Sequence, residues 1–207
     1  MSILHRARFV TSAAHARQLP PAGPPEVCFV GRSNVGKSSA INVLTNQRRL
    51  AHASKTPGRT RLINFFGLPD PLHPDDYLGF LVDLPGYGYA AVDKAQKQQW
   101  DALIGTYLQQ RSSIAGIVLL IDIRRGLTEL DLQLAHWIAP TQKPVLILAT
   151  KADKLAYGRR VTAMAAIQKQ WAKYSPSTVL AFSATQRLGL TEASEQIENW
   201  VSPKVIP

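Results

Sequence analysis

The segment GRSNVGKS, at residues 31–38, combines glycines with a lysine and a serine in a spacing that suits phosphate binding. It matches the pattern G-x-x-x-x-G-K-[ST] and lies between an apolar run that predicts a strand and a run with helical spacing. Glycines let backbone N–H groups converge on phosphate oxygens, and a helix N-terminus favours an anion. Lys37 can reach the β- and γ-phosphates, and the Ser38 hydroxyl can bind magnesium. A chance glycine-rich turn is the alternative, but it leaves the flanking strand and helix unexplained.

Two later segments suit recognition of a guanine base, TKAD (150–153) and FSA (182–184). The Asp153 carboxylate can accept two hydrogen bonds, from the ring N–H and the exocyclic amine of guanine, a donor pair that adenine lacks. The Lys151 stem can cover the base, and backbone N–H groups of the second segment can donate to the guanine carbonyl. Each segment alone is equally typical of a solvated loop. Their order after the phosphate-binding pattern favours a guanine nucleotide.

The segment DLPGYGY, at residues 83–89, would by itself predict only a Pro-Gly turn after a strand. In a nucleotide-binding chain, Asp83 suits a carboxylate that holds magnesium through water, and the Gly86 N–H suits a contact with the γ-phosphate. Thr60, shortly before the next strand, could bind magnesium only while the γ-phosphate remains. These contacts disappear on hydrolysis, so the pattern predicts a nucleotide switch.

Charge is unevenly distributed along the 207 residues, whose formal net charge is +10. Residues 1–69 hold ten Lys or Arg residues and one acid, Glu26, while the remaining chain holds 14 basic and 13 acidic residues. A basic pole of this kind predicts a polyanionic partner. The single cysteine, Cys28, lies in an apolar run and is expected to be buried filler in a reducing compartment.

Strand-like and helical runs alternate along the chain. Apolar runs at 26–31, 114–122, 144–150 and 178–184 predict parallel strands, and 61–68 with 77–84 predict a hairpin. We therefore expect an α/β P-loop G-domain with a mostly parallel six-stranded sheet, one antiparallel edge strand and helices on both faces. The G-domain is predicted to span 26–207, after a structured or loosely attached basic arm at 1–25. No apolar run approaches the roughly 20 residues of a membrane span, so no membrane association is expected.

The chain resembles the EngB/YihA family of ribosome-biogenesis GTPases, within the TrmE-Era-like group of P-loop GTPases. The resemblance is carried over nearly the whole chain by FVTSAAHARQLP, GRSNVGKSS, SKTPGRTRLINFF, VDLPGYGYA, DIRRGL, TKADKL and FSAT. It implies binding of GTP or GDP with Mg2+, a role in large ribosomal subunit assembly, and a link to cell division and septation. The expected partners are the large ribosomal subunit or its precursor and ribosomal RNA, and the expected state is a cytoplasmic monomer. Thr150 replaces the asparagine of the general guanine motif, which predicts fewer local hydrogen bonds.

The motifs and the resemblance together give the predicted site. Its catalytic residues are Lys37, Thr60 and Gly86, and its magnesium ligands are Ser38, Thr60 and, through water, Asp83. The predicted nucleotide-binding residues are Gly31, Arg32, Ser33, Asn34, Val35, Gly36, Lys37, Ser38, Gly58, Arg59, Thr60, Arg61, Leu62, Asp83, Leu84, Pro85, Gly86, Thr150, Lys151, Ala152, Asp153, Phe182, Ser183 and Ala184.

Tyr87 follows the switch glycine, at the position where Ras-like enzymes use a glutamine to orient the attacking water. A tyrosine cannot place water in that way, so slow intrinsic hydrolysis is expected. Asn34 stands where related GTPases use asparagine to hold potassium, and its alternative role is only to suit the tight loop. Tyr87 and Tyr89 either stack on RNA bases or pack within the switch.

Two other function classes remain as alternatives. A P-loop small-molecule kinase would keep the phosphate-binding loop, but it should carry an Arg-rich lid and does not need the T-K-x-D segment. A non-catalytic RNA-binding module with a vestigial nucleotide site is disfavoured by the intact Lys37, Ser38 and Asp83.

Overall fold

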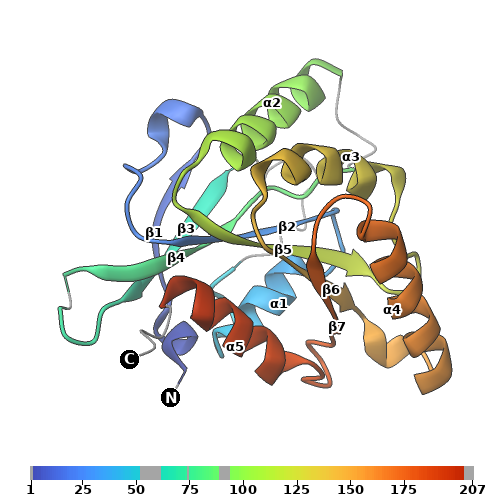
Figure 1. Ribbon diagram of the computed structural model, residues 1–207. Coiled ribbons are helices and arrows are strands. Elements are labelled where there is room, and N and C mark those ends of the chain that lie inside the picture. Colours follow the sequence, from blue (N-terminus) through green and yellow to red (C-terminus); the bar gives the residue numbers. More distant parts are fainter. Residues whose placement is uncertain (1, 52–61, 74, 89–93, 203–207) are drawn as a thin grey trace.

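The computed structural model describes residues 2–51, 62–73, 75–88 and 94–202, with the backbone alone for 94–101. Seven strands of this described part form one sheet in the order β1-β3-β4-β2-β5-β6-β7 (Figure 1). Their bounds are β1 (Arg8–Ala13), β2 (Glu26–Gly31), β3 (Ile63–Pro69), β4 (Tyr77–Asp83), β5 (Ile114–Asp122), β6 (Val145–Thr150) and β7 (Ser177–Ala181). Strands β4, β2, β5, β6 and β7 are parallel, so their carboxyl ends meet at one edge.

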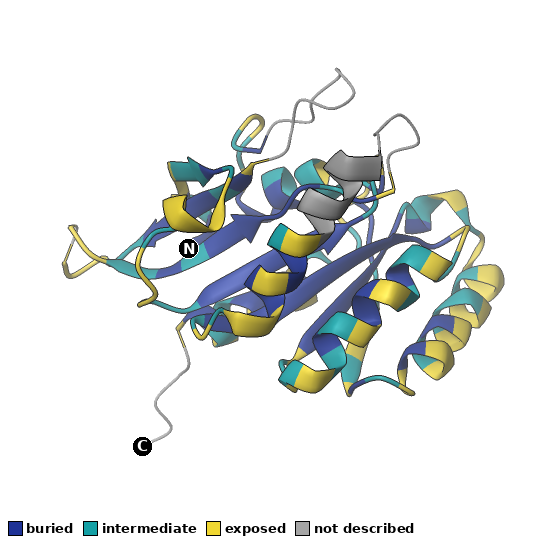
Figure 2. Cartoon of the chain, turned by 90° about the horizontal axis from the view of Figure 1, so that it is seen from above, coloured by how far each residue is buried: buried dark blue, intermediate teal, exposed yellow. Residues whose placement is uncertain are grey.

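Helices cover both faces of the sheet, as predicted. The α-helices are α1 (Lys37–Leu44), α2 (Lys94–Gln110), α3 (Glu129–Ile138), α4 (Tyr157–Trp171) and α5 (Leu190–Val201). The 3-10 helices are η1 (Ile3–Arg6), η2 (Ala16–Gln18), η3 (Ala139–Thr141) and η4 (Ala152–Lys154). Figure 2 shows the buried sheet between helices whose outer surfaces are exposed.

Alternation along the central strands explains this layering. In β2, Cys28 and Val30 pack with residues of α2, α3 and α4, whereas Val27 and Phe29 pack with α1, α5 and η1 on the opposite face. Both sets are buried, which is why β2 is an unbroken apolar run rather than an alternating one. Burial also raises the pKa of the Cys28 thiol, so the side chain is a neutral apolar filler, as expected.

The predicted count of six strands, with one antiparallel edge strand, was wrong by one strand. Strand β3 is antiparallel to β4, but β1 from the N-terminal arm pairs with its other side, from Arg8 opposite Gly67 to Ala13 opposite Ile63. Without β1, the outer N–H and C=O groups of β3 would form an exposed edge. Within the arm, Leu4 and Ala13 are fully buried, so the arm is structured and docked onto the domain.

A buried ionic cluster fixes the beginning of β2. The Glu26 carboxylate, 1% exposed, accepts hydrogen bonds from Arg111 Nη2 at 2.5 Å, from Ser113 Oγ at 2.8 Å and from the Tyr107 hydroxyl. Arg111 Nη1 also donates to the Pro20 carbonyl at 2.9 Å. The cluster therefore joins β2 to α2, to the start of β5 and to the end of the arm.

No helix in the described ranges is both long enough and apolar enough to cross a bilayer.

Candidate functional site

The phosphate-binding loop connects β2 to α1 at the carboxyl edge of the sheet. Asn34, with φ of 63°, and Gly36, with φ of 104°, adopt left-handed backbone conformations that curl the loop before α1 begins at Lys37. Gly31 lies so close to β5 that a Cβ atom there would be 2.8 Å from the Leu120 carbonyl oxygen. Small residues and asparagine are required at these positions because other side chains would clash or strain the turn.

Lys37 and Asp83 face each other across this loop. Lys37 is the first residue of α1 and Asp83 is the last residue of β4, and their side chains form an ion pair that is 12% and 4% exposed. Each charge is partly removed from water and is compensated by the other. The pair brings together the two residues that the sequence assigned to the terminal phosphates and to magnesium.

The segment after β4 is hydrogen-bonded to the phosphate-binding loop. The Ser33 N–H donates to the Tyr87 carbonyl at 2.9 Å, and the Tyr87 N–H donates to the Gly31 carbonyl at 3.3 Å. A Cβ atom on Gly86 would be 3.1 Å from Ser33 Oγ, which shows how closely the two backbones approach. Movement of the segment therefore requires these backbone hydrogen bonds to break.

Thr150, at the end of β6, ties the base-recognition segment to the loop. Its hydroxyl lies 2.7 Å from the Val35 carbonyl oxygen and 2.9 Å from the Ile121 carbonyl oxygen. Lys151, which has a left-handed φ of 58°, extends its Nζ to within 3.0 Å of the Asn34 carbonyl oxygen. The shorter threonine thus still links β6, β5 and the phosphate-binding loop, although the sequence had predicted fewer local hydrogen bonds.

Asp153 is oriented by the segment that follows β7. The buried Ser183 hydroxyl donates to Asp153 Oδ1 at 2.7 Å, while Lys154 Nζ lies 3.2 Å from Oδ2. The Ser183 hydrogen bond lowers the pKa of Asp153, so the carboxylate is an ionised acceptor near neutral pH. The Phe182 side chain is buried, and its carbonyl accepts from the Ala152 N–H at 3.1 Å. The Phe182 N–H donates to the Ala149 carbonyl at 2.9 Å, so the side chain and both backbone groups of Phe182 are engaged within the fold, and the residue positions the segment rather than offering a donor to the base.

Comparison with known proteins decides the family. The family model described as 50S ribosome-binding GTPase matches residues 26–151. The chain is 65% identical to a probable GTP-binding protein EngB of Bordetella pertussis, with 100% of both chains covered. It is 51% identical to a probable GTP-binding protein EngB of Paraburkholderia phymatum, covering 97% of this chain and 93% of the relative. The chain belongs to the EngB family of P-loop GTPases.

Solved structures agree with the EngB fold. A crystal structure of a probable GTP-binding protein engB matches with a TM-score of 0.68 at 20% identity, covering 85% of this chain and 98% of that chain. A structure of Era with MgGDPNP and a segment of 16S ribosomal RNA matches with a TM-score of 0.65 at 21% identity, covering 87% of this chain and 57% of that chain. At such identities these matches support the fold alone. The predicted α/β P-loop G-domain and the EngB resemblance are confirmed.

The structure brings most of the predicted EngB site together at the carboxyl edge, from the ends of β2, β4, β6 and β7. Leu62 is described, 37% exposed, directly before β3. The predicted residues Gly58, Arg59, Thr60 and Arg61, and also Tyr89, lie outside the described residues.

One connection in this EngB-family chain was missed from the sequence. The Tyr87 ring is 7% exposed, and its hydroxyl donates to Asp131 Oδ1 at 2.5 Å. Asp131 also caps α3, since its Oδ2 accepts from the Thr128 N–H at 2.7 Å and from the Thr128 hydroxyl at 2.6 Å. The capping pattern T-x-x-D at 128–131 was a signal for Asp131. Of the two roles left open for Tyr87, the structure has it packed rather than available for base stacking.

Proposed function

We propose that this EngB-family GTPase is a nucleotide switch in assembly of the large ribosomal subunit, acting in the cytoplasm and supporting normal cell division and septation. The observation that carries the proposal is the direct hydrogen bonding between the 83–87 segment and the phosphate-binding loop. A γ-phosphate that accepts from the Gly86 N–H would bind directly beside these hydrogen bonds of Tyr87, so occupancy of the site would change the conformation of the segment. The description of the family model as ribosome-binding supports the choice of partner.

The donor atoms suit magnesium. Ser38 contributes a hydroxyl near the N-terminus of α1, and Asp83 contributes a buried carboxylate. Oxygen donors of this kind, completed by phosphates and water, are what magnesium prefers. When bound, the ion supplies positive charge to the phosphate oxygens. Lys37 would then leave Asp83 and bind the β- and γ-phosphates, while Asp83 would hold a water on the metal.

The surface formed by residues 1–69 supports an RNA partner. Glu26 is the one acidic residue in this stretch, and it is buried against Arg111. The described arginines of the stretch include exposed side chains at Arg48 and Arg49, next to the end of α1. This part of the surface therefore presents cationic groups without an acidic side chain of its own, which suits RNA phosphates.

Co-sedimentation with large ribosomal subunits tests the proposal. We expect binding with a GTP analogue to exceed binding with GDP and to weaken steeply with salt. Replacing Arg48 and Arg49 by serine should reduce the slope of log affinity against log salt by about one for each arginine that pairs with an RNA phosphate. The matched control replaces two consecutive arginines of α4, Arg159 and Arg160, by serine, and it should leave the slope unchanged. Equal affinity in the GTP-analogue and GDP states would contradict the switch.

Hydrolysis is proposed to be slow without an added positive charge, because Tyr87 is held by Asp131 and cannot orient water. We propose potassium, placed by Asn34, as that charge. Turnover should be about tenfold faster in potassium than in sodium. The Asn34→Gly variant should lose this difference and still bind GDP, since glycine accepts the φ of 63° without strain.

Asn46→Gly is the matched control, because Asn46 is exposed and also has a positive φ, of 52°, just after α1. It should keep the potassium effect. If wild-type turnover is the same in both salts with and without ribosomes, potassium has no role. If Asn34→Gly keeps the difference, the asparagine serves only the loop conformation.

A further inference from the structure

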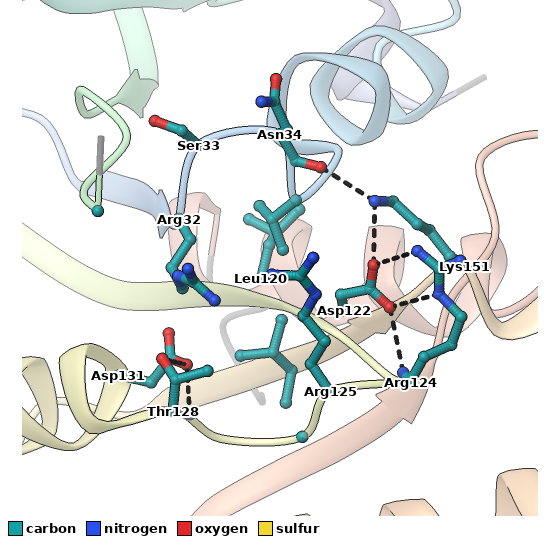
Figure 3. Close-up of a pocket in the computed structure, with 14 residues that line it drawn as sticks. Arg32, Ser33, Asn34, Leu120, Asp122, Arg124, Arg125, Thr128, Asp131 and Lys151 are labelled. Carbon is teal, nitrogen blue, oxygen red and sulfur yellow. Dashed lines mark hydrogen bonds and ion pairs between the residues drawn. The ribbon is translucent and has the colours of Figure 1, made fainter. Parts of the chain in front are cut away.

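A cavity of about 430 Å³ lies behind the phosphate-binding loop, between that loop and the connection from β5 to α3. Its charged lining comes from both sides, with Arg32 on the loop and Asp122, Arg124, Arg125, Asp131 and Lys151 opposite (Figure 3). The predicted phosphate, magnesium and guanine side chains Lys37, Ser38, Asp83 and Asp153 do not line it. It does share Arg32, Ser33, Asn34, Val35 and Lys151 with the predicted nucleotide-binding residues. The cavity therefore adjoins the nucleotide site at the phosphate-binding loop and extends from it toward the connection between β5 and α3.

The first carboxylate of the cavity is already neutralised. Asp122 accepts from Arg124 Nε at 2.9 Å and from Arg124 Nη2 at 2.6 Å, and Lys151 Nζ lies 3.0 Å from its Oδ2. The Arg124 hydrogen bonds, followed by those of Lys151, hold the pKa of Asp122 well below its usual range against the opposing effect of burial. Asp122 is thus surrounded by two cations of its own.

The second carboxylate is also fully engaged. Both oxygens of Asp131 accept hydrogen bonds, one from the Tyr87 hydroxyl and the other from the Thr128 N–H and hydroxyl. These hydrogen bonds cap α3 and fix Tyr87. In the described part of the chain, Asp131 forms no salt bridge with an arginine.

The guanidinium groups of Arg32 and Arg125 form no salt bridge with a carboxylate in the described part of the chain. Arg32 Nε is buried and has no hydrogen-bond partner among the described residues, and a Cβ atom on Gly88 would lie 3.3 Å from it. Within the same described ranges, no salt bridge or side-chain hydrogen bond is formed by Arg125. Figure 3 shows both guanidinium groups directed into the same cavity from opposite walls. Four cations and two carboxylates leave a surplus of positive charge around this space.

We propose that this cavity binds the phosphate group of a small phosphorylated molecule, as a second anion site beside the nucleotide site. Planar guanidinium groups form paired, charge-assisted hydrogen bonds with phosphate oxygens, and a dianion would balance the surplus charge. The phosphate would also supply an acceptor for the unsatisfied Arg32 Nε. The volume exceeds what a bare phosphate ion needs, so an attached group of the size of a sugar fits.

Calorimetric titration of GDP-saturated, magnesium-loaded protein tests this site while the nucleotide site is filled. The two probes are inorganic phosphate and ribose 5-phosphate. Binding of at least one probe is expected, and Arg125→Gln should weaken it about tenfold by removing one charge-assisted hydrogen bond. Arg159→Gln, an exposed arginine on α4, is the matched control and should bind the probe like the wild type.

The two probes distinguish the sources of the phosphate. Tighter binding of ribose 5-phosphate assigns the cavity to a phosphomonoester, whereas equal binding assigns it to the ion alone. Failure of both probes to bind at millimolar concentration overturns the proposal, as does an equal reduction of affinity in Arg125→Gln and Arg159→Gln. GDP affinity, measured on the same samples, should be unchanged in both variants and shows that they are folded.

Discussion

Replacing Asp153 with asparagine is expected to lower GDP affinity about 100-fold or more, because a site built to pair with two donors is left with a mismatched partner. The carboxylate offers two acceptor oxygens, while the amide offers one acceptor and an NH2 group that faces a guanine donor. A base with a carbonyl in place of the guanine amine should therefore regain affinity. Xanthosine diphosphate should bind Asp153→Asn more tightly than it binds the wild type.

Calorimetry or competition with a fluorescent nucleotide measures both effects. Asp70→Asn makes the same chemical change on the β3–β4 connection and should bind GDP like the wild type. Ser183→Ala, which removes the 2.7 Å hydrogen bond to Asp153 Oδ1, should produce a smaller reduction because the carboxylate remains. If Asp153→Asn binds GDP as tightly as the wild type, or if the wild type does not prefer GDP to ADP, the base is not recognised at this position.

The pH dependence of nucleotide affinity follows from the same interaction. The folded-state pKa of Asp153 is lowered, first by the Ser183 hydrogen bond, so the acceptor form is complete above the ordinary Asp pKa. Affinity contributed by Asp153 is therefore constant through neutral pH and declines only as pH falls through the lowered pKa.

Local features of the site were predictable from the sequence, because their causes are local. The glycines and Lys37 of the phosphate-binding loop are fixed by the turn from β2 into α1, and Asp153 follows closely after Thr150, the last residue of β6. Apolar runs likewise predicted the central strands, since a strand buried on both faces has little freedom in composition.

Interactions between distant segments were not predictable in the same way. Strand β1 was missed as a strand because its first residues are exposed and its pairing partner, β3, lies far along the chain, with Ala13 opposite Ile63. The Tyr87 hydroxyl and Asp131 are brought together by the order of β4, β2 and β5 in the sheet, and the spacing of residues in the sequence does not reveal that contact. The cavity charges depend on which carboxylates are already paired, which is a property of the folded arrangement.

The buried Glu26 cluster leads to the largest expected effect on stability. Replacing Glu26 with alanine should lower the free energy of unfolding by about 3–5 kcal/mol, because Arg111 would remain largely buried without its partner. The change also removes acceptors from Ser113 and Tyr107, so three elements are no longer attached to β2 through this carboxylate. Chemical denaturation followed by circular dichroism measures the change.

Two comparisons isolate the ionic cause of that destabilisation. The Asp70→Ala variant removes a carboxylate whose His73 partner has a side chain that is 70% exposed, and it should change stability far less than Glu26→Ala does. A double variant, Glu26→Met with Arg111→Met, should be more stable than Glu26→Ala, because apolar side chains of suitable size avoid the unpaired buried charge. If the double variant is as unstable as the sum of its single changes, the stability of this corner depends on packing volume and hydrogen bonds to the backbone rather than on compensation of the Arg111 charge. The alkylation rate of the buried Cys28 thiol, two residues after Glu26 in β2, should rank these variants in the reverse order of their stabilities. The thiol reacts only when local unfolding around the start of β2 exposes it.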